Sequence, residues 1–109
     1  MCSNNRGNEY GLRHTSLKKE NPAFWAWTFE QIGTEDIPSV VSYVRANTSA
    51  SKVHYVGHSQ GTAVMFVQLS KNPGFSGNLA SFTAISPITQ IGDAKTAYRE
   101  FVGFFDPLL

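Results

Sequence analysis

The pentapeptide Gly57-His58-Ser59-Gln60-Gly61 constrains the fold of this chain more than any other segment. It matches the pattern G-x-S-x-G, in which a serine occupies a sharp turn between a strand and a helix. Its flanks fit that position, because the β-type run 53–56 comes before it and the helix-type run 62–69 follows it. Five residues alone are a weak signal, but the same pattern between a strand and a helix is a specific one.

Hydrophobic spacing predicts helices on both sides of this turn. Thr28 and Gln31 have the spacing of a capping box, which predicts that a helical turn begins there. Pro38 is tolerated in the first turn of the helical stretch that follows. That stretch has an apolar stripe on one face, formed by Ile37, Val40, Val41 and Val44. Residues 60–71 predict a further helix, apolar on most sides and therefore buried, which Asn72-Pro73-Gly74 ends.

Two short strands complete the predicted elements. The first covers residues 52–56, and the second covers residues 79–85 before Ser86-Pro87. The order helix, strand, helix, strand suits a right-handed parallel β-α-β unit, so the fold class is α/β. Residues 1–21 are typical of a loop, and residues 47–51 form a polar break.

The bulk composition narrows the classes of function. The chain has 109 residues, of which 41% are hydrophobic, enough for one modest core. Its net charge of +1 gives no electrostatic case for binding nucleic acid or an anionic membrane. We expect no transmembrane segment, since no apolar run approaches about 18 residues, and no signal peptide, since residues 1–11 are polar. Cys2 cannot form an internal disulfide, and Asn47 begins a glycosylation sequon that matters only in a secreted protein.

The chemistry of the turn centres on Ser59. A neutral serine hydroxyl is a poor nucleophile, so it needs a base and a rigid position facing the substrate carbonyl. The turn supplies the position by holding the serine backbone in a sparsely populated conformation. Gln60 begins the helix, and its N–H is placed to stabilise an oxyanion, an interaction worth about 2.7–4 kcal/mol. We expect Gly57 and Gly61 to lie where strand and helix pass too close for side chains, with His58 packing beside the turn.

Similarity to known sequences extends well beyond the pentapeptide. Residues 54–62 read HYVGHSQGT, and four further segments follow the pattern of the same family: NNRGN at 4–8, FWAWTFE at 24–30, DIP at 36–38 and AISP at 84–87. On these segments, which fall in order from residue 4 to about residue 88, the chain resembles the acid lipase family of α/β-hydrolases. This family includes gastric lipase and lysosomal acid lipase. The segments together are far more specific than any one of them.

The resemblance implies a partial α/β-hydrolase fold, with the core at residues 1–89 and the start of a helical cap at 90–109. Full members cleave neutral lipid esters, triacylglycerols or cholesteryl esters, and no cofactor or metal is expected. Ser59 resembles their nucleophile, and Gln60 resembles the residue whose N–H stabilises the oxyanion. Their H-G oxyanion segment would lie upstream, and their triad aspartate and histidine downstream of Leu109, so we expect the chain to be inactive alone. The compartment of this chain stays open, whereas full-length relatives are expected to be secreted or lysosomal and to meet a lipid interface through the cap.

Other residues of the chain are weak substitutes for the missing base. His58 is next to Ser59, but neighbours around such a turn point apart. His54 is expected to be a satisfied core histidine, and His14 sits in a polar segment. The i, i+4 spacing of His54 and His58 does not predict zinc, because that motif needs a helix, an adjacent glutamate and a third ligand. Three carboxylates are expected at helix ends or in loops: Asp36, Asp93 and Asp106.

Three functions remain open at this stage. The first is hydrolysis of lipid esters, and the second is a non-catalytic truncated paralogue that docks on a full-length relative through an apolar tail at residues 94–109. The third is another activity of the same fold, such as a thioesterase or peptidase, which shares the turn but not its flanks. The aromatic cluster at residues 24–29 could bind lipid, although packing is the commoner role of aromatic side chains.

Overall fold

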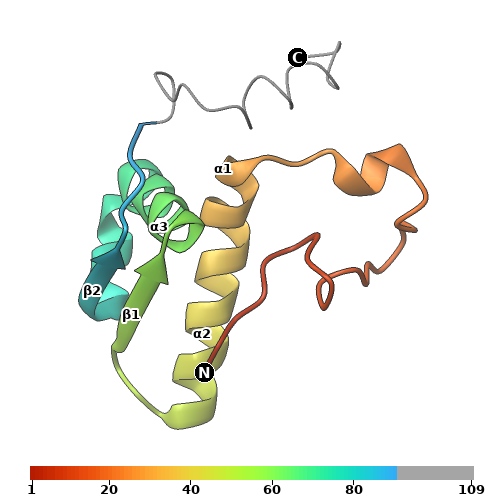
Figure 1. Ribbon diagram of the computed structural model, residues 1–109. Helices are drawn as coiled ribbons and strands as arrows, with labels where there is room; N and C mark the ends of the chain where they lie inside the picture. Colours follow the sequence, from red (N-terminus) through yellow and green to blue (C-terminus); the bar gives the residue numbers. More distant parts are fainter. Residues whose placement is uncertain (91–109) are drawn as a thin grey trace.

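Two parallel strands, β1 (Val53–His58) and β2 (Leu79–Ile85), form the sheet in the computed structural model of this protein (Figure 1). The structure describes residues 1–90, so the expected cap at 90–109 lies almost entirely outside the described residues. The strands pair from Val53 opposite Leu79 to His58 opposite Ile85, with one irregularity after Val53. β1 runs two residues beyond its predicted end, because Gly57 and His58 are still paired with β2.

The helix α3 (Gln60–Lys71) connects the two strands and confirms the predicted parallel β-α-β arrangement. It begins and ends at the predicted residues, and the short 3-10 helix η3 (Pro73–Asn78) leads from it into β2. Within α3, Val64 and Met65 are fully buried, whereas Phe66 and Val67 are half-buried. The expectation that this helix is buried on most sides is therefore wrong for one face, which the described residues leave open.

A long helical segment packs beside this unit. It consists of α1 (Phe29–Gln31), the π-helical turn η2 (Ile32–Asp36) and α2 (Ile37–Thr48), which follow one another without a break. The predicted capping box is confirmed, since Thr28 and Gln31 exchange side-chain and backbone hydrogen bonds. Pro38 lies in the first turn of α2, as predicted. The polar break predicted at residues 47–51 begins only at Ser49. Asn47 and Thr48 still belong to α2, because their side chains donate hydrogen bonds to carbonyls of the preceding helical turn.

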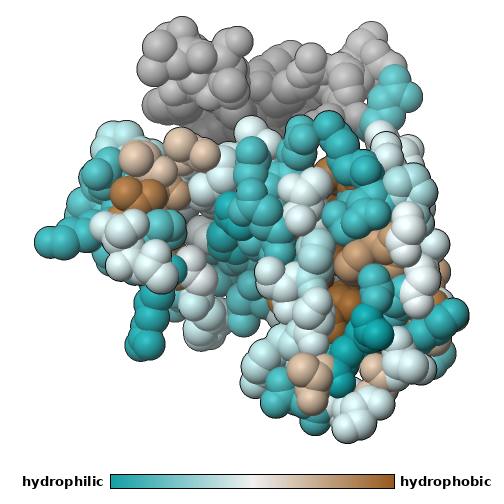
Figure 2. All heavy atoms as spheres, turned by 180° about the vertical axis from the view of Figure 1, so that it is seen from behind, coloured by the Kyte–Doolittle hydropathy of each residue, from teal (hydrophilic) through white to brown (hydrophobic). Residues whose placement is uncertain are grey.

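The core lies between these helices and the sheet. The predicted stripe of α2 faces it, with Ile37 and Val41 buried and Val40 and Val44 half-buried. The buried hydrophobic cluster consists of Ile32, Ile37, Val41, Val64, Met65 and Phe75. On the surface seen from behind, apolar residues emerge as separate patches among polar ones (Figure 2). Among the described residues, no helix is long and apolar enough to cross a bilayer.

The aromatic cluster divides between packing and exposure. Phe24, in the 3-10 helix η1 (Pro22–Trp25), is buried, and Trp27 packs against the core. Trp25 and Phe29 remain 46% and 49% exposed. Packing is therefore the main role of Phe24 and Trp27, while the other two present apolar surface to solvent.

Arg6 fastens the N-terminal loop to the helical segment through Asp36. Its backbone N–H donates to Asp36 Oδ2 at 2.9 Å, and its Nε donates to Asp36 Oδ1 at 2.8 Å. Nη2 of the same guanidinium also lies 2.6 Å from Glu35 Oε2. The hydrogen bond to Asp36 raises the pKa of Arg6. Asp36 stands at the junction of η2 and α2, as expected of a helix-end carboxylate.

Gly33 marks the closest approach of η2 to α3. A Cβ atom at this position would lie 2.8 Å from the Val64 carbonyl oxygen and 2.8 Å from Val67 Cγ1. The carbonyl belongs to the backbone of a buried helix, so it cannot move aside without disturbing the core. A glycine at this position therefore allows the helical segment to seat against α3.

Replacing Gly33 with alanine should destabilise the protein by about 1–3 kcal/mol, the usual cost of overpacking a filled core. The measurement is the free energy of unfolding from urea titration. Gly77→Ala is the matched control, because a Cβ at Gly77 meets nothing within 4 Å among the described residues. Equal stability of the two variants would contradict the close packing of η2 on α3.

Candidate active site

Ser59 occupies the turn between β1 and α3 in a strained conformation. Its φ and ψ angles are 51° and −113°, outside the regions that residues with a side chain normally adopt. Such a conformation costs about 1–3 kcal/mol and persists only where surrounding structure enforces it. The expectation of a sparsely populated backbone at this serine is confirmed.

Hydrogen bonds hold both peptide groups of Ser59. Its N–H donates to the Ile85 carbonyl at 3.0 Å, which extends the strand pairing by one residue. Its carbonyl accepts from the Thr62 N–H at 2.9 Å and from the Thr62 hydroxyl at 2.6 Å. The turn is thus tied to β2 on one side and to the first turn of α3 on the other.

Gly57 lies at the crossing of β1 and α3, as expected. A Cβ at this position would come within 2.7 Å of the Gly61 carbonyl oxygen and 2.9 Å of the Thr62 nitrogen. The same expectation is wrong for Gly61. Among the described residues, a Cβ at Gly61 would meet only Tyr55 Oη, at an ordinary 3.8 Å. The position that a Cβ would occupy faces away from Gly57, whereas the Gly61 carbonyl faces it.

Tyr55 braces the same crossing from inside the sheet. Its hydroxyl donates to the Gly61 carbonyl at 2.9 Å. Burial raises the pKa of this phenol, so it stays protonated and remains a donor at neutral pH. Sequence reasoning missed this contact and that of Thr62, although both residues lie in the segment 54–62 that resembles known sequences.

Gln60 is the first residue of α3 and is exposed, and Ser59 is half-buried beside it. Because Gln60 is the first residue of the helix, its backbone N–H has no helical carbonyl four residues earlier to which it could donate. The positive end of the helix dipole lies at the same place. The N-terminus of α3 can therefore stabilise negative charge that develops next to Ser59.

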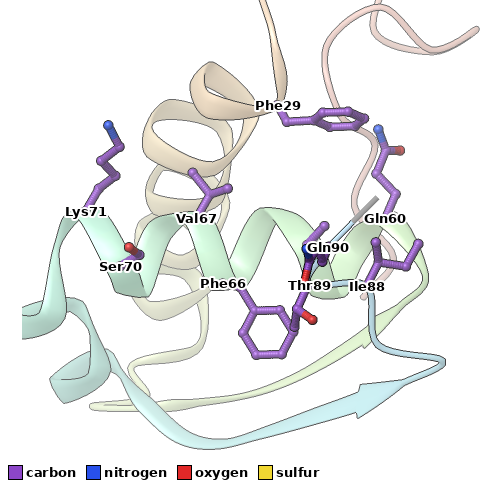
Figure 3. A pocket seen from close by; sticks show the side chains of 10 residues that line it. Phe29, Gln60, Phe66, Val67, Ser70, Lys71, Ile88, Thr89 and Gln90 are labelled. Carbon is purple, nitrogen blue, oxygen red and sulfur yellow. The ribbon is translucent and has the colours of Figure 1, made fainter. Parts of the chain in front are cut away.

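An apolar hollow of about 440 Å³ lies along the open face of α3 (Figure 3). Gln60 and Lys71 stand at its two ends, and the Phe29 ring covers it from the start of α1. Lys71 pairs with Glu30 at 2.9 Å, an exposed pair that contributes little stability. The remaining lining residues are Ala63, Phe66, Val67, Ser70, Ile88, Thr89 and Gln90.

In the described residues, the hydrogen bonds of the histidines go to groups other than Ser59. His54 and His58 project from β1 on the face away from the core and are exposed. The expectation of a core histidine at His54 is wrong, because alternate residues of a strand face opposite sides and only Val53 and Tyr55 pack inward. His54 Nδ1 is instead 2.8 Å from Ser81 Oγ. His14 Nδ1 accepts from the backbone N–H groups of its own loop.

No further acid, base or metal centre forms in residues 1–90. Asp36 is engaged by Arg6, and Asp93 and Asp106 lie outside the described residues. In the 109-residue sequence, no histidine follows Ser59. The part of the chain that the structure describes contains no group of three or more histidine, cysteine or acidic side chains suited to a metal ion.

Comparison with curated proteins finds lipases along nearly the whole chain. Lipase lipl-3 of Caenorhabditis elegans is 36% identical over 103 residues, which are 94% of this chain and 26% of that lipase. Lipase lipl-5 of the same animal is 37% identical over the same extent. Gastric triacylglycerol lipase of Bos taurus is 32% identical over 97 residues, 89% of this chain and 24% of the lipase.

The chain spans about a quarter of the length of these relatives. A scan against protein-family models finds no match.

The two glycines of the turn should respond oppositely to alanine. Gly57→Ala should cost about 1–3 kcal/mol of unfolding free energy, because the added Cβ collides with the backbone of α3. Gly61→Ala should be neutral or stabilising by up to about 1 kcal/mol, because glycine is a poor helix former and the Cβ has room. Urea titration of the two variants measures both values, and a larger loss at Gly61 would contradict the geometry of the crossing.

Proposed function

The chain belongs to the acid lipase-like family, as its similarity to lipases over about 90% of its length shows, and on this premise we propose that it forms the nucleophile segment of a serine ester hydrolase. Ser59 is the proposed nucleophile, and the Gln60 backbone N–H is the proposed oxyanion donor. The proposed substrates are neutral lipid esters, triacylglycerols or cholesteryl esters. The activity belongs to the whole protein, of which these residues supply one part.

The observation that carries the proposal is the conformation of Ser59. A positive φ at a serine is costly in free energy. Here it occurs at the residue that lies between the end of β1 and the N-terminus of α3. This arrangement matches the strained strand-to-helix turn that exposes a nucleophilic serine. An ordinary connection between β1 and α3 would need neither the strain nor the close crossing at Gly57.

The proposed reaction follows from this placement. Ser59 Oγ attacks the ester carbonyl while a base takes its proton, and the carbonyl oxygen becomes an oxyanion. The N-terminus of α3 then offers the Gln60 N–H and the helix dipole to that charge. Collapse of the intermediate releases the alcohol and leaves an acyl-serine, which water hydrolyses.

The base is assigned to a histidine outside these 109 residues, supported by an aspartate. The chain order of this fold is serine, acid, histidine, and no histidine follows Ser59 here. We therefore expect the isolated chain to lack ester hydrolase activity.

Two observations support lipid esters as the substrate class. The relatives are lipases, and one is named for triacylglycerol. The surface of the hollow on α3 is mainly apolar, although half of its lining residues are polar, and the hollow begins at Gln60, next to Ser59. A lipid interface would meet the whole protein through the cap that residues 90–109 are proposed to begin. A thioesterase or peptidase activity has no comparable support.

A non-catalytic role is the second candidate. On the face of the sheet away from α3, Val56 is 64% exposed and Ile85 is 49% exposed. Apolar side chains exposed on a parallel sheet are unusual, because such sheets are normally covered on both faces. This face could dock on a full-length relative, which size-exclusion chromatography of the two proteins together would reveal.

A chimera tests the nucleophile directly. The 103 residues of the worm lipase lipl-3 that align with this chain are replaced by the corresponding residues of the chain. The chimera should react with a fluorophosphonate probe at Ser59, and Ser59→Ala should abolish the labelling. Intact-mass and peptide mass spectrometry measure the adduct.

The control variant is Ser49→Ala, because Ser49 is also a serine with a positive φ, 55°, directly after α2 and outside the turn. It should label like the parent chimera. A folded chimera that stays unlabelled would refute the proposed nucleophile. Labelling of Ser59 in the isolated 109-residue chain would refute the assignment of the base to residues outside it.

A further inference from the structure

Thr62 is a fully buried polar residue, with a relative exposure of 0%. It lies in the first turn of α3, three residues after Ser59. Its hydroxyl makes two hydrogen bonds, to the Ser59 carbonyl oxygen at 2.6 Å and to the Ile88 nitrogen at 3.0 Å. The second bond joins residues that are 26 positions apart in the chain.

The direction of these bonds is fixed by chemistry. The Ile88 backbone N–H can only donate, so the Thr62 oxygen accepts from it. The single hydroxyl proton is then free to donate to the Ser59 carbonyl, which can only accept. One side chain therefore links the Ser59 carbonyl to the Ile88 N–H.

This link completes a closed connection between the ends of β1 and β2. The Ser59 N–H is bound to the Ile85 carbonyl, and the Ser59 carbonyl is bound through Thr62 to the Ile88 N–H. The two peptide groups that flank the Ser59 Cα are thereby held by hydrogen bonds to residues 85–88, one directly and one through Thr62. Fixing both peptide groups fixes the direction of the Cα–Cβ bond, which limits the hydroxyl of Ser59 to the few positions that its staggered χ1 rotamers allow.

We infer that Thr62 is a positioning residue for Ser59. The Thr62 hydroxyl aligns the nucleophile because it joins the Ser59 carbonyl to the segment that follows β2. The inference rests on the proposed function, since positioning matters only if Ser59 reacts. A Ser or Thr in a first helical turn also bonds to nearby backbone for stability alone. The bond to Ile88 is the part that a purely local cap does not explain.

The test compares Thr62→Val with Thr62→Ser in the lipl-3 chimera. Valine keeps the shape but removes both hydrogen bonds, whereas serine keeps the hydroxyl. The maximal rate of fluorophosphonate labelling at Ser59 should fall by about tenfold or more in Thr62→Val, because misplacement of a reacting group by about 1 Å costs up to a hundredfold. The probe concentration at half-maximal rate should change little, and Thr62→Ser should recover most of the rate.

Thr48→Val is the matched control. Its hydroxyl also donates to a backbone carbonyl, that of Val44 at 2.7 Å, at the far end of α2 from Ser59. It should label like the parent. Circular dichroism melting of each variant gives the folded fraction, to which every labelling rate is normalised.

The outcomes separate the inference from the proposed function. If the parent chimera labels at Ser59 and folded Thr62→Val labels at the same normalised rate, the positioning role is wrong while the nucleophile stands. If the parent chimera folds and does not label, both fail. Should Thr62→Val not fold, Ile88→Pro removes the backbone N–H that donates to the Thr62 hydroxyl, and Ile88→Ala is its control because the Ile88 side chain also lines the hollow on α3. Equal normalised labelling rates in Ile88→Pro and Ile88→Ala would overturn the inference.

Discussion

The positive φ of Ser59 is the constraint on which the rest of the described structure depends. Its cost of about 1–3 kcal/mol is similar to the gain from two or three hydrogen bonds of about 0.5–1.5 kcal/mol each. The bonds of the Ser59 N–H and carbonyl to Ile85 and Thr62 supply that number. The bond to Ile85 forms only if β1 and β2 are parallel and stay in register to their last residues, and the two bonds from Thr62 form only if α3 begins directly after Ser59. The strain of one residue therefore requires the whole β-α-β unit.

The helix α3 can meet this requirement because it is fixed from two sides. At its start, the absence of a side chain at Gly57 lets the strand cross within contact of the first helical turn. Further along, Gly33 brings η2 against Val64 and Val67, so the long helical segment braces α3 over its middle. Arg6 in turn holds the N-terminal loop to the junction of η2 and α2. Local packing far from Ser59 thus contributes to the rigidity of the turn.

Sequence patterns predicted the features that depend on neighbours along the chain. The bounds of α3 and β2, the capping box at Thr28 and the strained turn all follow from spacing within a few residues. The π-helical turn η2 leaves no such pattern, because its hydrogen bonds shift by one residue without a change in residue type. The Thr62–Ile88 bond joins segments that approach only after the strands have paired. The roles of Ser59 and Gln60 in a reaction stay predictions.

The exposure of His54 shows where reasoning from a strand pattern reaches its limit. The run Val53–Val56 is apolar enough to suggest burial on both faces, which is typical of a strand in a parallel sheet. The described residues cover one face with α3 and leave Val56 64% exposed on the other. The relatives are about four times as long as the matched region. In the proposed whole protein, further chain would cover this face, so the environment of the two histidines on β1 depends on residues beyond those described.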